Sequence, residues 1–172
     1  MSISIGCNLD SVEPLSDSIL KVILKPDHFV DYIAGQYLNI EWGGGSLSYS
    51  IANAPLGAHR YELHIRHHKD NTEVSNLLAH LKTHGRVNVS LPYGHCHMDA
   101  LDKTRPIIFI AGGTGFAPVK AMIEQLLAQG DERSFELFFG ARSQIDFYLE
   151  DLVSTWKKHA QYFKKSQLAI NN

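Results

Sequence analysis

The chain has 172 residues, of which 44% are hydrophobic and 20% are charged, and its formal net charge is −2. These values are typical of a globular protein and exclude a disordered or fibrous one. The 16 basic and 18 acidic residues form no long run of either sign, so the chain has no field that would attract nucleic acid or an anionic membrane surface. We therefore expect small-molecule ligands, with neither nucleic acid nor a membrane as partner.

The cysteines and the N-terminus bear on the compartment. Cys7 and Cys96 form no CxxC motif, and residues 1–10 have neither the basic nor the apolar region of a signal peptide. We therefore expect a cytoplasmic protein, with Cys96 as a small buried residue. The strongest apolar stretch, residues 107–111, is far shorter than the roughly 20 residues that cross a bilayer, and we expect it to form a buried strand.

The first hundred residues read as a small antiparallel β-barrel. Runs of β-branched and aromatic residues alternate with turn signals and predict strands at Ser18–Leu24, Tyr37–Trp42, Tyr49–Ala52, Tyr61–His67 and Arg86–Leu91. Five or six strands at this spacing favour a barrel. One helix is predicted over Glu73–Thr83, where apolar residues recur at helical spacing and Gly85 follows as a stop.

After the charged linker 99–105 the pattern changes. Strands are predicted at 106–111, 135–139 and 166–170, and helices at 118–129 and 147–159. This β-α-β-α order predicts a parallel sheet. We expect a flavin-type barrel domain over residues 1–103 and a nucleotide-type α/β domain over 104–172. That second domain should be incomplete, because a five-stranded doubly wound domain needs on the order of 100 residues.

A glycine-rich turn follows the first strand of the α/β segment. Gly112, Gly113, Thr114 and Gly115 leave a hydrophobic strand and enter a helix, where backbone N–H groups and the helix dipole can receive a pyrophosphate. Pro118 stands where the GxGxxG fingerprint has its third small residue. A purely structural strand-to-helix turn is the alternative.

The next strand ends at Gly140-Ala141-Arg142. Nucleotide-binding folds place a ribose-reading residue there, and an arginine can pair with a 2′-phosphate. Arg142 therefore favours NADPH slightly over NADH, and a solvated loop arginine is the alternative.

Residues 47–55 carry a second motif. Tyr49 offers an aromatic face, and Ser48, Ser50 and Asn53 offer short polar groups beside it. An isoalloxazine ring needs such a surface for stacking and for its polar edge. An ordinary half-buried strand at the edge of a sheet is the alternative.

Taken in order, these motifs resemble those of the ferredoxin-NADP reductase superfamily. The chain is most similar to the short NAD(P)H-flavin reductases, including those that serve bacterial luciferase, from about residue 5 to residue 155. The resemblance is carried by Gly35-Gln36-Tyr37, Tyr49-Ser50, Leu63-His64-Ile65-Arg66, Pro92-Tyr93-Gly94, Gly112–Pro118 and Gly140-Ala141-Arg142.

The resemblance implies a hydride transfer from NAD(P)H to a flavin, which is FAD, FMN or riboflavin. Tyr49 would lie beside the isoalloxazine and Ser50 near its N5 edge, while Thr114 would lie close to the nicotinamide. The remaining implied contacts are backbone groups of Leu63, His64, Ile65 and Arg66 for the flavin, Gly112, Gly113, Gly115, Pro118 and Arg142 for the nucleotide, and Ser75 as an anion site at a helix N-terminus. No side chain has to act as a general acid or base, because the cofactors carry the chemistry.

One departure from the family bears on how the flavin is used. Leu47 stands where the family has an arginine two residues before the aromatic, which fits a flavin that is bound weakly and released as a substrate. The chain also has no cysteine set for an iron-sulfur cluster, so electrons would leave through free flavin or through a partner protein such as an oxygenase. Histidine pairs such as His80 and His84 have no third ligand in the sequence, and we expect no metal site.

The leading hypothesis is therefore an NAD(P)H-dependent flavin oxidoreductase. The alternative is a non-catalytic fragment that binds flavin or a partner through its barrel. A third hypothesis is a fragment with little stability of its own, because an unfinished parallel sheet leaves a hydrophobic edge exposed, and aggregation or dimerisation through that edge would support it. The choice of flavin, of NADH or NADPH, of the final acceptor and of the oligomeric state stays open.

Overall fold

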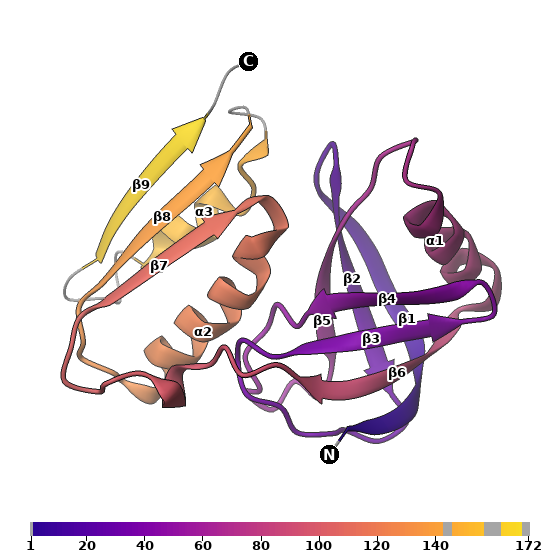
Figure 1. Ribbon diagram of the computed structural model, residues 1–172, viewed down its shortest axis with the longest axis horizontal. Helices are drawn as coiled ribbons and strands as arrows, with labels where there is room; N and C mark the ends of the chain where they lie inside the picture. Colours follow the sequence, from indigo (N-terminus) through magenta and orange to yellow (C-terminus); the bar gives the residue numbers. More distant parts are fainter. Residues whose placement is uncertain (1, 143–145, 157–162, 170–172) are drawn as a thin grey trace.

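Two structural units lie side by side in the computed structural model (Figure 1), which describes residues 2–142, 146–156 and 163–169. The first unit contains β1 (Ile3–Ser16), β2 (Ile19–Pro26), β3 (Tyr37–Trp42), β4 (Gly45–Ser50), β5 (Tyr61–Arg66), α1 (Thr72–His84) and β6 (Arg86–Tyr93). The second contains β7 (Ile107–Gly112), α2 (Phe116–Gln129), β8 (Phe135–Ala141), α3 (Glu150–Trp156) and β9 (Phe163–Ala169). Short 3-10 helices lie at η1 (Met98–Ala100) and η2 (Gly113–Gly115).

The first unit is a curled antiparallel sheet of six strands in the order β4-β3-β6-β1-β2-β5. Its two edge strands approach each other at the bridge between Ile51 and Leu63. The predicted six-stranded barrel is confirmed. The prediction lacked β1, whose sequence carries Gly6, Asn8 and Asp10 and is ordered by pairing with β2 on one side and β6 on the other.

Helix α1 packs on the barrel. It begins where the Asn71 side chain accepts a hydrogen bond from the N–H of Val74, and it ends at Gly85, whose φ of 65° is a left-handed C-cap conformation. Val74, Leu77 and Leu81 are buried in the barrel core. The helix agrees with the prediction to within one residue at each end.

The second unit is a parallel sheet in the order β7-β8-β9, as predicted. Helix α3 begins at Glu150 and not at Phe147. Phe147 and Tyr148 are instead buried in the core, and Leu149 has a φ of 59°, which is incompatible with a helix. The end of the predicted helix, at 157–159, lies outside the described residues.

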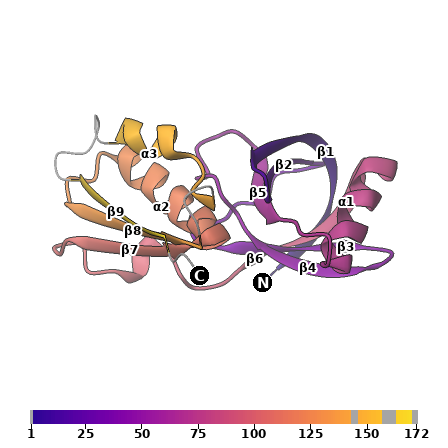
Figure 2. The same ribbon diagram turned by 90° about the horizontal axis from the view of Figure 1, so that it is seen from above.

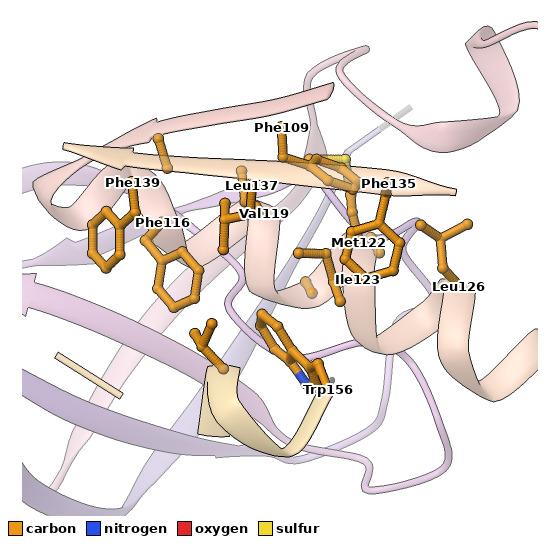
Figure 3. Packing of buried hydrophobic residues seen from close by; sticks show 14 of the residues in the cluster. Phe109, Phe116, Val119, Met122, Ile123, Leu126, Phe135, Leu137, Phe139 and Trp156 are labelled. Atoms are coloured by element: carbon orange, nitrogen blue, oxygen red, sulfur yellow. The ribbon is translucent and has the colours of Figure 1, made fainter. Parts of the chain in front are cut away.

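The core of this unit is rich in aromatic residues (Figure 3). Phe116 at the start of α2 stacks on Phe139 of β8, with ring centroids 4.6 Å apart, and Trp156 of α3 packs beside Phe116 at 6.0 Å. These contacts fix the first turn of α2 against the sheet, which positions the glycine turn that precedes it.

Only one face of the parallel sheet is covered by described helices, since α2 and α3 lie on the same side of it (Figure 2). Residues of β7 therefore alternate: Ile107, Phe109 and Ala111 are buried, whereas Ile108 and Ile110 are 64% and 78% exposed. The expectation that residues 107–111 form a fully buried strand was wrong for Ile108 and Ile110. Parallel sheets are usually buried on both faces.

No helix in the described part of the chain is long and apolar enough to cross a membrane.

Candidate functional site

The Gly35-Gln36-Tyr37 motif has a structural role. Gln36 accepts a hydrogen bond from the N–H of Ile33 and donates one to the carbonyl of Gly94, at 2.8 and 3.0 Å. Gly35 has a φ of 104°, and a Cβ there would collide with the carbonyl oxygen of Cys96. Only glycine fits this close approach, so the motif joins the loop before β3 to the one after β6.

The Tyr49-Ser50 motif lies at the end of β4 where the barrel curls toward β5. Tyr49 is half-buried and packs against the barrel core. Burial, together with the negative charge of Glu73 at the start of α1, raises the pKa of Tyr49 to about 12, so its phenol is neutral at physiological pH. Ser50, next to Tyr49 in the chain, is half-buried and pairs with Tyr37 on the neighbouring strand β3. Leu47, at the position of the family's arginine, packs against the barrel core.

Strand β5 presents two kinds of group to the site. Leu63, His64 and Ile65 are each 3% exposed or less, backbone included, whereas Arg66 is half-buried. The Arg66 side chain leaves the barrel and lies against the glycine turn, where a Cβ added to Gly113 would be 2.8 Å from its Nη2 atom.

The glycine turn forms η2 and contacts β5, β7 and β8. Gly113 has a φ of 52°, and a Cβ added at Gly112 or Gly115 would meet nothing within 4 Å. No side chain caps the N-terminus of α2, and Pro118 lies in its first turn. This region is thus an open cradle beside a helix N-terminus, the arrangement that favours an anion, and Thr114 lies half-buried inside it.

Parallel pairing brings the two nucleotide motifs to one edge. Gly112 pairs with Gly140, so the glycine turn and Arg142 both follow the carboxyl ends of adjacent strands, where open α/β sheets bind ligands. Arg142 is exposed and lines a hollow of about 720 Å³ together with His68, Asp70, Asn71, Thr72 and Glu73.

That hollow joins two regions that the sequence analysis treated separately. The loop before α1 comes from the barrel and Arg142 from the α/β unit. Ser75 is exposed on the first turn of α1 and does not line the hollow. The structure thus groups Arg142 with the loop before α1, and Ser75 lies next to that group.

Sequence reasoning missed a buried polar cluster between the units. Lys120 of α2 lies within 3.4 Å of Glu62 on β5, and the Tyr148 hydroxyl lies 3.0 Å from His64 Nδ1. The available signal was a lysine on the apolar stretch of α2, between the buried residues Val119 and Ala121.

Other candidates lie outside this site. Cys96 is exposed, contrary to expectation. His80 stacks on His84, and each has a backbone carbonyl partner. Within residues 2–142, 146–156 and 163–169, no group of three or more His, Cys, Asp or Glu residues is arranged to hold a metal ion.

Comparison with known proteins matches both units to family models. The model described as an oxidoreductase FAD-binding domain matches residues 7–98, and the one described as an oxidoreductase NAD-binding domain matches residues 109–169. The NAD(P)H-flavin reductase of Vibrio harveyi is 32% identical over 164 residues, covering 91% of this chain and 69% of the reductase.

Two further similarities are informative. Terephthalate 1,2-dioxygenase, reductase component 1, from Comamonas is 35% identical over 148 residues, covering 86% of this chain and 44% of that protein. Ferredoxin-NADP+ reductase from Plasmodium falciparum with 2′P-AMP shares the fold, with a TM-score of 0.83 at 17% identity over 98% of this chain and 73% of that one. The chain spans 44–45% of the length of several curated relatives that it matches.

Proposed function

Since the chain belongs to the oxidoreductases that carry an FAD-binding and an NAD-binding domain and adopts the ferredoxin-NADP reductase fold, we propose that it transfers a hydride from NAD(P)H to a flavin. One observation carries the proposal: Arg66 of the barrel lies against Gly113 of the glycine turn. The motif proposed for the flavin and the motif proposed for the nucleotide therefore converge at the contact between the two units.

In the barrel, Tyr49 supplies a neutral aromatic face and Ser50 a hydroxyl next to it. Arg66, half-buried at the end of β5, extends this surface, and backbone groups of the buried residues Leu63, His64 and Ile65 are the further proposed contacts. The apolar Leu47 offers no charged contact to a phosphate, so this surface suits the isoalloxazine more than the phosphate end of FAD or FMN. That balance supports a flavin which binds as a substrate and is then released.

In the α/β unit, the residues proposed for the nucleotide are those of the glycine turn and its flanks. Gly112, Gly113 and Gly115 let a pyrophosphate approach the N-terminus of α2, with Pro118 in its first turn and the Arg66 guanidinium beside it. Thr114 orients the nicotinamide. Arg142 lies at the edge of the sheet where a 2′-phosphate would be read, and Ser75 on the first turn of α1 is a further proposed contact.

The cofactors supply the redox chemistry, since a reduced nicotinamide can pass a hydride to the flavin N5. What the protein would contribute is alignment, with Tyr49 and Thr114 as the residues that would hold the two rings in register. Ser50 can donate a hydrogen bond toward the flavin edge. Positioning of this kind lowers a barrier without a side-chain acid or base.

The test is NADH and NADPH consumption by the purified chain, with and without riboflavin, FMN or FAD. Flavin-dependent consumption of one nucleotide supports the proposal and identifies both substrates. Flavin binding without consumption supports the alternative, a flavin- or partner-binding module. The absence of both sinks the proposal.

We also propose that the reduced flavin, or the chain itself, delivers electrons to an oxygenase or another acceptor protein. The relative from Comamonas is named as the reductase component of a dioxygenase, which supports an acceptor of that class. Adding a purified oxygenase component to the assay and measuring coupled substrate oxidation tests this part.

A further inference from the structure

The described residues include an almost fully buried lysine at the contact between the two units. Lys120 is 5% exposed. Its ammonium lies 3.0 Å from the carbonyl oxygen of Ala52, 2.7 Å from Glu124 Oε1 and 3.3 Å from Glu62 Oε1. An ammonium has three N–H donors, and this site offers an acceptor to each of them. Lys120 is therefore buried with an acceptor within reach of each of its donors.

A histidine extends the cluster on the barrel side. His64 is 3% exposed, with Nε2 2.8 Å from Glu62 Oε1 and Nδ1 3.0 Å from the Tyr148 hydroxyl. Burial lowers the pKa of His64. Burial alone would raise the pKa of Glu62, but the hydrogen bond from His64 and the charge of Lys120 lower it. His64 is therefore neutral, donating from Nε2 to ionised Glu62 and accepting at Nδ1 from Tyr148.

The cluster alternates between the two units. Glu62 and His64 belong to β5 of the barrel, Lys120 and Glu124 belong to α2, and Tyr148 lies between β8 and α3. Each link from Lys120 to Glu62 and from His64 to Tyr148 thus crosses the contact between the units. Phe116 and Phe139 pack against the Tyr148 ring at 5.7 and 5.9 Å, which connects the cluster to the core behind the glycine turn.

A second set of bonds connects the cluster to the flavin motif. The carbonyl of Ala52 accepts from Lys120, and the N–H of Ala54 donates to Glu124 Oε2 at 3.2 Å. The two alanines lie two and four residues after Ser50. On the other side, Lys120 lies five residues after Gly115 on the helix that the glycine turn begins. The cluster therefore joins the two motifs through short pieces of backbone.

We infer that Lys120, Glu62 and His64 form a positioning cluster that sets the separation and angle between the Tyr49-Ser50 segment and the glycine turn. This inference rests on the proposed hydride transfer for its kinetic consequence. Buried ion pairs contribute little net stability but, in some proteins, specify one geometry. Rates of transfer between two bound rings depend steeply on alignment, and an error of about 1 Å can cost roughly a hundredfold. The three residues act through the placement of other groups.

The first test separates alignment from binding. Lys120→Met keeps the length of the side chain and removes its charge and donors, and Lys21→Met is the matched control, because Lys21 forms a 2.7 Å ion pair with Glu13 on the barrel surface. We expect Lys120→Met to lower kcat roughly tenfold to a hundredfold, with the flavin Kd and both KM values changed by less than about threefold. Lys21→Met should leave all of them unchanged. A kcat equal to that of the parent would overturn the inference.

The second test reads the geometry without turnover. Spin labels at Lys25→Cys and Ala128→Cys, both exposed and one in each unit, are placed in a Cys96→Ser background. Pulsed electron resonance should give a narrow distance distribution in this parent and a clearly broader one after Lys120→Met. Glu62→Gln keeps the shape of the side chain and should also broaden the distance distribution. It replaces Lys120→Met in this test if that variant does not fold. An unchanged distribution in a folded variant refutes the positioning role.

Together the two tests distinguish failure of the inference from failure of the proposed function. If the parent consumes no NAD(P)H with any flavin, the hydride-transfer proposal fails, and the label distances alone then decide whether the cluster fixes the two units. If the parent is active and both variants broaden the distances without lowering kcat, the function stands and the inference fails.

Discussion

The Arg66 guanidinium, at the end of β5, lies so close to Gly113 in the turn after β7 that a Cβ added at Gly113 would be 2.8 Å from Nη2. Gly113 also has a φ of 52°. A residue with a Cβ atom adopts this left-handed backbone conformation at a cost of roughly 1–2 kcal/mol. The backbone of the turn thus favours glycine at this position, whereas the flexible end of the Arg66 side chain would have to shift to admit a methyl group.

Gly113→Ala should therefore displace Arg66 and weaken nucleotide binding by about tenfold or more, from the loss of one charge-assisted contact. The measurement is the Kd for NADH and NADPH by titration, with a thermal melt of each variant. Gly57→Ala is the control for backbone strain, because Gly57 has a φ of 85° and open space around it, and Gly112→Ala tests the site without that strain. If all three variants bind NADH and NADPH with the same Kd, the turn is not part of the nucleotide site.

Tyr49 is the residue on which the flavin proposal depends most. Tyr49→Leu should weaken flavin binding by about threefold to tenfold, since an aromatic stack contributes about 0.5–1.5 kcal/mol beyond its buried area. Quenching of flavin fluorescence measures this directly. Trp42→Leu, a half-buried aromatic at the opposite end of the β3–β4 hairpin, is the control and should leave flavin affinity unchanged. The reverse order of effects would place the flavin elsewhere.

The barrel and the parallel sheet were predictable because local patterns determine them. Tyr37–Trp42 alternates apolar and polar residues and is β3 to the residue, and the αL glycines Gly85 and Gly130 end both long helices. β1 was missed although residues 3–10 alternate apolar and polar residues, because Gly6, Asn8 and Asp10 have low strand propensity and the alternation is interrupted at the register shift between Leu9 and Ser11. Pairing with β2 and β6 orders the strand. Tertiary packing likewise explains why α3 begins three residues later than predicted. Phe147 and Tyr148 have helical spacing in the sequence, but both are buried in the core before the helix begins.

The residues of the candidate site likewise fall into those that local sequence identifies and those that only tertiary contacts identify. Motif residues such as Tyr49 and Gly113 could be named from the sequence, since each is recognisable within a few neighbours. The contact of Arg66 with Gly113, and the cluster of Lys120 with Glu62, join residues 47 and 58 positions apart. Nothing local specifies such pairings, and the folded arrangement of the two units alone brings them together.

Alkaline pH should destabilise the fold through Tyr61. Its hydroxyl donates to the carbonyl of Val30 and accepts from the Val30 N–H, both at 3.0 Å, and burial raises its pKa from 10.0 to about 12. The unfolded chain releases this proton at the lower pH, so the stabilising contribution is complete below about pH 10 and is lost progressively up to about pH 12. Tyr49 and Cys7, whose pKa values burial also raises to about 12, act in the same direction.

Urea unfolding at about pH 8 and about pH 11 checks this. Tyr61→Phe should be less stable near neutrality by about 1–3 kcal/mol, because it leaves two buried backbone groups unpaired, but should lose less stability on going to high pH. Parallel pH profiles for the parent and Tyr61→Phe would contradict the assignment of the alkaline effect to this hydroxyl.

The two cysteines should differ sharply in reactivity. Cys7 is fully buried in the barrel and burial raises its pKa, whereas Cys96 is exposed. Because the thiolate is the reactive form and must be accessible, a thiol reagent should modify one cysteine rapidly in the folded protein and both in denaturant. Cys96→Ser should abolish the rapid phase and leave the slow one. A rapid phase that persists in Cys96→Ser would mean that the barrel opens near Cys7 on the timescale of the assay.

The uncovered face of the β7-β8-β9 sheet should drive self-association. Ile108, Ile110 and Phe138 are 64%, 78% and 38% exposed and share the face of the sheet opposite α2 and α3 (Figure 2), which the segment 95–101 borders. Contiguous apolar surface of this kind promotes association in water. The double variant Ile108→Lys with Ile110→Lys should therefore lower the weight-average mass measured by sedimentation at high concentration, with little change in Tm because neither side chain contributes to the core.

The control is Ile123→Ala, on the buried face of α2. This variant should lower Tm, because the cavity it leaves costs about 2–5 kcal/mol of stability, and it should not reduce association. If the double lysine variant associates as strongly as the parent, the face is not the contact surface.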